Sequence, residues 1–465
     1  MSLRERSRSL RCVLAMLACA LSVVLAAPAA AQQYAPEDDF TANWTRADAL
    51  KVRLDPTNTK PAIPADFPVM TNEVWVWDTW PLTRLDMKPV SYKGWHLIFS
   101  LVAPRNIGFD ARHEVATIGY FYSRDGKSWR YGGEVFPRDT ARGARQWAGS
   151  AVLIGTQIQL VYTASGNNED PQVPDPNWDL NANQRIARAT AQIRADANGV
   201  WFAGQQFRNS RIIAEADGRY YQTEAQGRYR QPGGAPNLMA FRDPFVFRDP
   251  ADDQVYMLFE GNIAGENPVA GTKTCGPAEV GPVPPGHVVP PNANLYEGAV
   301  GLARAENANL TRWTLLPPLL SSVCTNAQTE RPHLVVYEGR YYLMTISHTF
   351  TYAPGLTGPD GVYGFMGESL RSDYEPLNAS ALVLGNPPEQ PFQAYSEYVM
   401  PNWLVEAFID RIPLPGGGQR SGGTLAPTLR LEVDGSNTYM VEQLDYGFIP
   451  AMANAGGALS ASARR

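Results

Sequence analysis

Short segments in which apolar and polar residues alternate recur along most of the chain, and they constrain the fold more than any other feature. Alternation with a period of two is typical of half-buried β-strands, and Gly, Asn and Asp separate the segments as turn residues do. Few stretches show the period of an amphipathic helix. The pattern predicts an all-β fold, with strands over Trp95–Val102, Ala116–Tyr122, Ala151–Ile154, Gln157–Thr163, Gln254–Phe259, Ala299–Ala303, His333–Tyr337 and Arg340–Ile346.

A degenerate repeat joins several of these segments. Ser123–Trp129, Glu306–Trp313 and Arg371–Pro376 each supply a polar turn after one strand and a bulky residue before the next. Repeated four-stranded units favour a β-propeller with a central funnel, because its blades leave only short edges exposed. A two-sheet sandwich is the alternative architecture. The repeat is too degenerate to count blades.

The N-terminus is typical of a secretory signal peptide. Arginines within residues 4–11 precede an apolar run over residues 12–27, and small residues offer a cleavage site near Ala31. A membrane anchor is the alternative, but the apolar run is short and no later stretch is apolar enough to span a bilayer. We therefore expect a secreted protein, extracellular or periplasmic, with a signal peptide over 1–31, an extended arm over 32–60, one domain over 61–450 and a flexible tail over 451–465.

Charge excludes one class of partner. The 465 residues carry a net charge of −6, without a basic face or a long run of like charge, so nucleic acid is not an expected partner. The 11 Trp and 21 Tyr residues suit a large core, and some suit a cleft in which flat rings cover the apolar faces of a sugar. We expect a monomer.

The cysteine content agrees with export. Cys12 and Cys19 leave with the signal peptide, so that only Cys275 and Cys324 remain. An even number of cysteines in an oxidising compartment predicts a disulfide between them, with two buried free thiols as the alternative. Metal ligation is not expected, because no Cys-x-x-Cys or nearby His pair accompanies them.

Three segments carry candidate catalytic carboxylates. Glu73-Val-Trp-Val-Trp-Asp-Thr-Trp-Pro81 places Asp78 at the end of an aromatic strand, where a carboxylate is costly to bury unless it is paired or reactive. Phe241-Arg-Asp-Pro244 contains Asp243, and Thr329-Glu-Arg-Pro-His333 contains Glu330. Each has a structural alternative: Asp78 as a turn or cap, Asp243 paired with Arg242, and Glu330 in a surface ion pair with Arg331.

The three segments, in this order and widely separated, resemble the levansucrase group, glycoside hydrolase family 68. The resemblance extends from about Asn43 to about Asp445. It implies a single catalytic β-propeller of five blades that cleaves sucrose and transfers fructose, without a cofactor. Sucrose and fructan or oligosaccharide acceptors are then the partners.

The resemblance implies a role for each carboxylate. Asp78 is the nucleophile that forms a covalent fructosyl intermediate. Glu330 is the acid that protonates the departing glucose oxygen and then the base that activates the acceptor. Asp243 is the transition-state stabiliser, gripping fructose hydroxyls as the ring gains oxocarbenium character. If configuration is retained, the carboxyls of Asp78 and Glu330 should lie about 5 Å apart.

Further positions follow from the same resemblance with less specific motifs. Arg331, beside the acid, is expected to point away from it or to bind substrate. The expected substrate-binding residues are Trp77, Trp147, Arg242, Glu260, Gln328, Arg331, His348 and Tyr395.

The chain departs from the family pattern at several positions. Ala148 stands where a serine hydroxyl is expected to bond the nucleophile, and Glu397 stands where a histidine is expected. Ala327 lies nearest to the position of an acidic calcium ligand, so that we expect no metal and assign the stabilising role to the disulfide.

Two other functions remain open from the sequence. The same fold and carboxylates fit an enzyme that mainly hydrolyses sucrose or fructan. A non-catalytic sugar-binding propeller is the alternative from another class, which the departures at Ala148 and Glu397 leave open.

Overall fold

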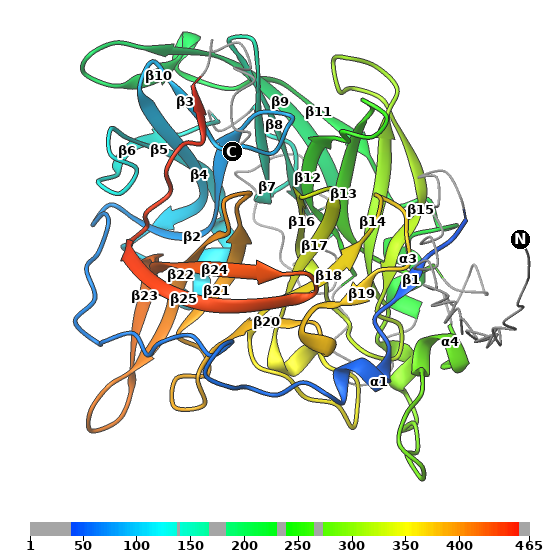
Figure 1. Ribbon diagram of the computed structural model, residues 1–465. Coiled ribbons are helices and arrows are strands. Elements are labelled where there is room, and N and C mark those ends of the chain that lie inside the picture. The colour runs from blue at the N-terminus through cyan, green and yellow to red at the C-terminus, as the bar shows by residue number, and fades with distance from the viewer. Residues whose placement is uncertain (1–38, 137–139, 167–182, 230–238, 265–272, 455–465) are drawn as a thin grey trace, which may run out of the picture. The chain divides into compact units, whose positions relative to one another are not determined.

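Antiparallel strands are the main regular structure of the chain that the structure describes. The structure, a computed structural model, describes residues 39–136, 140–166, 183–229, 239–264 and 273–454 (Figure 1). The main strands follow one another in antiparallel runs. In order, the runs are β2 (Val74–Thr83), β4 (Trp95–Pro104), β5 (Thr117–Ser123) and β6 (Arg130–Glu134); β7 (Arg145–Ile154), β8 (Gln157–Ser165), β9 (Gln184–Ala195) and β11 (Arg208–Ala214); β12 (Phe241–Arg248), β13 (Val255–Asn262), β14 (Gly298–Ala305) and β15 (Trp313–Ser321); β16 (Glu330–Tyr337), β17 (Arg340–Ser347), β18 (Gly361–Gly367), β19 (Glu375–Pro376) and β20 (Leu382–Gly385); and β21 (Ala394–Val399), β22 (Leu404–Pro413), β23 (Gln419–Leu425), β24 (Pro427–Asp434) and β25 (Asn437–Tyr446).

Helices are few and short. Every helix of the described residues is too short or too polar to cross a membrane. The remaining elements are β1 (Ala42–Asn43), β3 (Val90–Tyr92), β10 (Val200–Phe202), β26 (Ala453–Asn454), α1 (Arg46–Ala49), α3 (Glu224–Tyr229), α4 (Pro277–Val280) and the 3₁₀ turns η1 (Phe109–Val115), η2 (Ala203–Gln205), η3 (Ala293–Leu295), η4 (Thr349–Thr351) and η5 (Leu377–Ala379).

The first strands of the runs form a closed ring. Strands β2, β7, β12, β16 and β21 contact one another in this order, and β21 contacts β2. A ring of inner strands with further strands hydrogen-bonded outward is a β-propeller, so the all-β propeller prediction is confirmed and the sandwich is wrong. Because β2 and β7 also pair in parallel, the described strands make four hydrogen-bonded sheets, and the count of five blades stays a prediction.

The degenerate repeat marks one kind of hairpin. Its three copies connect the third strand of a run to the fourth, β5 to β6, β14 to β15 and β18 to β19. The predicted strands are also present. One example is the pair β16 and β17, which a two-residue turn connects. Glu338 and Gly339 in this turn both have positive φ, 51° and 78°, as a two-residue hairpin requires.

The part of the arm that the structure describes packs against the propeller. Strand β1 pairs in parallel with β15, and Thr45 and Asp48 form a capping box that starts α1. The buried ring of Trp44 lies 5.1 Å from that of Tyr363. The predicted signal peptide and most of the predicted tail lie outside the described residues.

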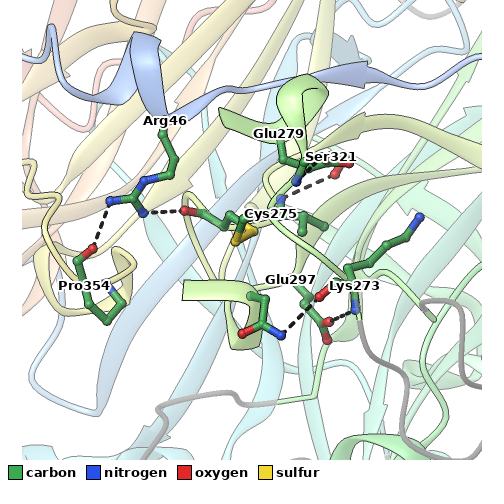
Figure 2. Close-up of a disulfide and its surroundings, with 11 residues drawn as sticks. Arg46, Lys273, Cys275, Glu279, Glu297, Ser321 and Pro354 are labelled. Atoms are coloured by element: carbon green, nitrogen blue, oxygen red, sulfur yellow. Dashed lines mark hydrogen bonds between the residues drawn. A yellow bond between two sulfur atoms is a disulfide. The ribbon is translucent and has the colours of Figure 1, made fainter. Parts of the chain in front are cut away.

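The predicted disulfide is present. Cys275 and Cys324 are bonded, with their Cα atoms 5.7 Å apart. Figure 2 shows the buried Arg46 beside it, which donates hydrogen bonds to the Cys324 carbonyl at 2.7 Å and the Pro354 carbonyl at 2.9 Å. The disulfide and Arg46 thus join α1, the segment before α4 and the segment before β16.

Removing the disulfide should destabilise the protein. The bond links residues 49 positions apart, and a closed loop of this length stabilises by about 4 kcal/mol in the chain-entropy model. We expect the double variant Cys275→Ala, Cys324→Ala to lose about this much free energy of unfolding, measured by urea denaturation. Reductant should lower the free energy of unfolding of the wild-type protein to that of the variant, and it should leave the variant's value unchanged. Equal stability of the two oxidised proteins would contradict the prediction.

Candidate active site

Irregularities in the inner strands place the candidate residues. Asp78, Asp243, Arg331 and Ser396 have positive φ values of 44°, 58°, 46° and 67°, and each lies at a register shift between its inner strand and the next strand. A bulge of this kind interrupts the alternation of side chains and turns the strand. Left-handed backbone is unfavourable for residues with a Cβ, which makes its recurrence on four inner strands a sign of function.

The three predicted catalytic carboxylates line one pocket. Asp78 comes from β2, Asp243 from β12 and Glu330 from β16, so the ring of strands brings together residues far apart in the sequence. The side chain of Glu330 is 18% exposed. The pocket is lined by Trp77, Asp78, Arg112, His113, Asp243, Glu330, Arg331, Ile346, His348, Tyr395, Phe408 and Asp410.

A buried guanidinium lies among the carboxylates. The Nε of Arg242 is 2.7 Å from Oε2 of Glu260 and 3.9 Å from Oδ2 of Asp243, and its Nη2 donates to Oε1 of Glu330 at 3.0 Å. Burial raises the pKa of Asp243 to about 7 against the opposing charge of Arg242, and burial also raises the pKa of Glu260. Arg242 thus orients Glu330 and holds Glu260 behind the pocket.

Arg331 points away from its neighbour Glu330, as one of the two expectations has it. Its guanidinium donates to the backbone carbonyl of Ser396 at 2.8 Å, to the Ser396 hydroxyl and to the carbonyl of Thr79. Its backbone N–H donates to Oδ2 of Asp243 at 3.1 Å. Arg331 therefore ties the bulges of three inner strands to one another.

The Ser396 hydroxyl, rather than one from position 148, interacts with Asp78. Burial raises the pKa of Asp78 above its usual value, and the charge of Arg331 and a hydrogen bond from Ser396 oppose this rise. The backbone carbonyl of Ala148 accepts a hydrogen bond from Thr163 at 3.0 Å, and Thr163 accepts one from the N–H of Asp243 at 2.8 Å. The departure at Ala148 therefore leaves Asp78 with a donor.

Tyr395 and His348 lie on the Glu330 side of the pocket. The Tyr395 hydroxyl donates to Oε2 of Glu330. The imidazole of His348 stacks on the Tyr395 ring, with centroids 3.6 Å apart, and its Nδ1 lies 2.8 Å from Oδ2 of Asp360. Burial alone would lower the pKa of His348, but the hydrogen bond and charge of Asp360 raise it above its usual value.

Of the other predicted substrate-binding residues, some line the pocket and some lie outside it. Trp77 lines the pocket, whereas Glu260 is fully buried behind Arg242. Trp147 and Gln328 are not among the residues that line it. Gln328 is buried, its backbone carbonyl accepting a hydrogen bond from Ser347 at 2.9 Å.

Glu397 is explained by a partner that sequence reasoning missed. Its side chain, 1% exposed, forms an ion pair with Nζ of Lys60, which is 4% exposed. Lys60 belongs to the arm and Glu397 to β21. A histidine could not neutralise this buried ammonium, so the two residues form one structural unit.

Sequence reasoning also missed several charged residues around the pocket. Arg112 lies over the rings of Phe109 and Trp77, at 3.8 and 5.5 Å, and its Nη2 lies 3.4 Å from Oδ1 of Asp410. Burial lowers the pKa of His113 to about 3, so this imidazole is neutral. No motif marks the η1 residues. Strand β22 carried a usable signal, since two-residue alternation places Asp410 and Glu406 on one face of an apolar segment.

These features define the class of protein: a β-propeller in which three inner strands each bring a carboxyl group to one pocket, an arrangement that glycoside chemistry can use. Among the described residues, no group of three or more His, Cys, Asp and Glu side chains is placed to hold a metal ion. The chain belongs to the Levansucrase/Invertase family of glycoside hydrolases, whose model matches residues 34–450.

Individual relatives agree with the family. A levansucrase of Pseudomonas savastanoi pv. glycinea is 46% identical over 430 residues, 88% of this chain and 97% of that protein. An extracellular sucrase of Zymomonas mobilis subsp. mobilis is 45% identical over 415 residues, 88% and 95% of the two chains. The structure of an inulosucrase from Halalkalicoccus jeotgali bound to kestose superimposes with a TM-score of 0.77 at 36% identity, covering 90% of this chain and 99% of that one.

The Lys60–Glu397 pair gives a stability prediction. Lys60→Met should leave Glu397 as an uncompensated buried charge and lower the free energy of unfolding by about 3–5 kcal/mol. The double variant Lys60→Met, Glu397→Leu removes both charges and should recover most of that loss in urea denaturation. If the double variant is as unstable as the single one, the charge pair is not the cause.

Glu406 gives a pH-dependent prediction. Neither of its buried oxygens accepts a hydrogen bond from a described residue, and burial raises its pKa to about 8. Between its usual pKa of 4.5 and about 8, the folded protein holds a proton that the unfolded chain releases, so stability falls as pH rises through this window. Glu406→Gln cannot ionise, and its stability relative to wild type should rise by about 4 kcal/mol from pH 4.5 to pH 8.

The measurement is urea denaturation of both proteins across that pH range. Glu442→Gln, which changes a side chain 44% exposed on β25, is the control and should follow the wild-type curve. Parallel curves for Glu406→Gln and wild type would show that Glu406 ionises at its ordinary pKa.

Proposed function

We propose that this protein cleaves sucrose, releases glucose and transfers the fructosyl unit to a fructan, a fructo-oligosaccharide or water, with retention of configuration. The observation that carries the proposal is the meeting of Asp78, Asp243 and Glu330 in one pocket. Membership of the Levansucrase/Invertase family and 46% identity to a levansucrase support the choice of donor.

Asp78 is the nucleophile in this proposal. Its carboxylate attacks the anomeric carbon of the fructosyl unit and forms an ester bond as the bond to the glucose oxygen breaks. The charge of Arg331 and the hydrogen bond from Ser396 support the ionised carboxylate that this step needs.

Glu330 is the general acid and then the general base. It gives its proton to the departing glucose oxygen, and it takes a proton from the acceptor hydroxyl that attacks the fructosyl ester. The hydrogen bonds from Arg242 and Tyr395 fix both of its oxygens, and its partial exposure is consistent with access for leaving group and acceptor.

Asp243 stabilises the transition state. Its Oδ2 accepts a hydrogen bond from the backbone N–H of Arg331. This bond orients the carboxyl group and leaves Oδ1 to bind substrate. A carboxylate that bonds fructose hydroxyls binds more strongly as the ring gains positive charge, so it lowers the barrier rather than only binding the substrate.

Two alternatives belong to the same test. The similarity to an extracellular sucrase favours a mainly hydrolytic enzyme, whereas the kestose bound to the inulosucrase favours transfer to oligosaccharides. A non-catalytic sugar-binding propeller would release no glucose at all.

We also propose that the protein acts outside the cytoplasm, after cleavage of its signal peptide near Ala31. The Cys275–Cys324 disulfide fits an oxidising compartment, and one relative is described as extracellular.

The test is the release of glucose and free fructose from sucrose. Asp78→Asn should lower glucose release by at least about a thousandfold, because the intermediate no longer forms. Glucose in excess of free fructose in the wild-type reaction identifies a transferase, and equal amounts identify a hydrolase.

The chain offers a matched control in Asp249→Asn. Asp249 lies in a second Arg-Asp-Pro tripeptide that is outside the pocket, where it accepts a hydrogen bond from the N–H of Ala251 at 3.0 Å. This variant should keep releasing glucose. Wild-type protein that releases none would refute the proposal.

A further inference from the structure

Three aromatic rings form a continuous stack that leads out of the pocket. The Tyr395 and His348 rings lie 3.6 Å apart and within 11° of parallel, and the His348 and Phe350 rings lie 4.7 Å apart and within 17°. Exposure rises along the stack, from 7% for Tyr395 through 22% for the His348 side chain to 59% for Phe350. The stack therefore runs from the interior to solvent.

The inner end of the stack touches the proposed acid/base. Tyr395 donates its hydroxyl hydrogen to Glu330, the carboxyl that faces the departing glucose and then the acceptor. The stack thus starts at the acceptor side of the reacting bond. Phe350 is the outermost of the three rings, two rings away from the residue that contacts Glu330.

Phe350 is held in a defined position despite its exposure. Asp360 fixes this segment through both of its carboxyl oxygens. Its Oδ2 lies 2.8 Å from Nδ1 of His348, and its Oδ1 accepts a hydrogen bond from the N–H of Thr349 at 2.7 Å. Thr351 closes the turn η4 by donating its hydroxyl to the carbonyl of His348 at 2.8 Å. A preorganised ring loses little conformational freedom when a ligand binds to it.

A flat exposed ring suits a sugar. The apolar C–H faces of a furanose or pyranose pack on aromatic rings, and polar groups nearby supply orientation. Asp360 raises the pKa of His348 and so favours the protonated imidazole. A positive charge on this ring adds to its attraction to the aromatic rings on either side of it.

We propose that Phe350 forms an outer acceptor subsite, on which the second sugar unit of a fructo-oligosaccharide stacks while its terminal hydroxyl is placed beside Glu330. This inference rests on the proposed function and adds a residue that selects acceptors by length. Water cannot contact Phe350 while it reacts beside Glu330, so the ring favours transfer to chains over hydrolysis.

The test separates donor use from acceptor use, with kestose as the added acceptor. Phe350→Ala should raise the KM for kestose about tenfold and increase the share of free fructose, because the stacking contact is lost. The KM for sucrose and total glucose release should stay within about twofold of wild type, because Phe350 lies outside the donor pocket. Phe350→Trp keeps an aromatic ring at this position and should have the wild-type KM for kestose.

Phe392→Ala is the matched control, since Phe392 is also an exposed phenylalanine, 41% accessible, outside the residues that line the pocket. It should leave both KM values unchanged. An unchanged KM for kestose in Phe350→Ala, or an equal rise in the KM for sucrose, overturns the subsite. A wild-type enzyme that releases glucose but never extends kestose overturns the subsite alone, whereas one that releases no glucose overturns the proposed function as well.

Discussion

The site depends on the interaction of the buried Arg242 guanidinium with the carboxyl groups around it. The guanidinium lies within 4 Å of carboxyl oxygens from Asp243, Glu260 and Glu330, which come from three different strands. Buried carboxylates this close repel one another and shed their charge unless a cation compensates them. Arg242 supplies that charge, donates a hydrogen bond to Glu330 and lies against the carboxyl of Glu260.

Backbone geometry complements this charge. The bulges at Asp78, Asp243, Arg331 and Ser396 interrupt the alternation of the inner strands where these strands face the pocket. Arg331 then connects three of the bulges through Thr79, Ser396 and Asp243. The site is therefore a set of equivalent irregularities on successive strands, held in register by side chains that bond to backbone.

Much of this arrangement was predictable from the sequence. Alternating strands and polar turns predicted the propeller, and the local motifs located Asp78, Asp243 and Glu330, because each motif is contiguous in the chain. Arg112 and His113 could not be found in this way, since no motif marks them and they reach the pocket only through the fold. The Lys60–Glu397 pair was equally hidden, because its members are 337 positions apart and no pattern links them. The number of blades and the separation of Asp78 and Glu330 remain predictions.

The strained bulges have a consequence for how such a protein can change over generations. Asp78 and Asp243 hold a left-handed conformation that costs a residue with a Cβ on the order of 1 kcal/mol, and glycine would adopt it without that cost and without burying a carboxyl group. Selection for heat resistance alone would therefore favour glycine at these two positions, in conflict with selection for turnover. The pocket persists in a lineage only while the reaction is useful to the cell, and a copy released from that requirement would drift toward a sturdier, inert propeller.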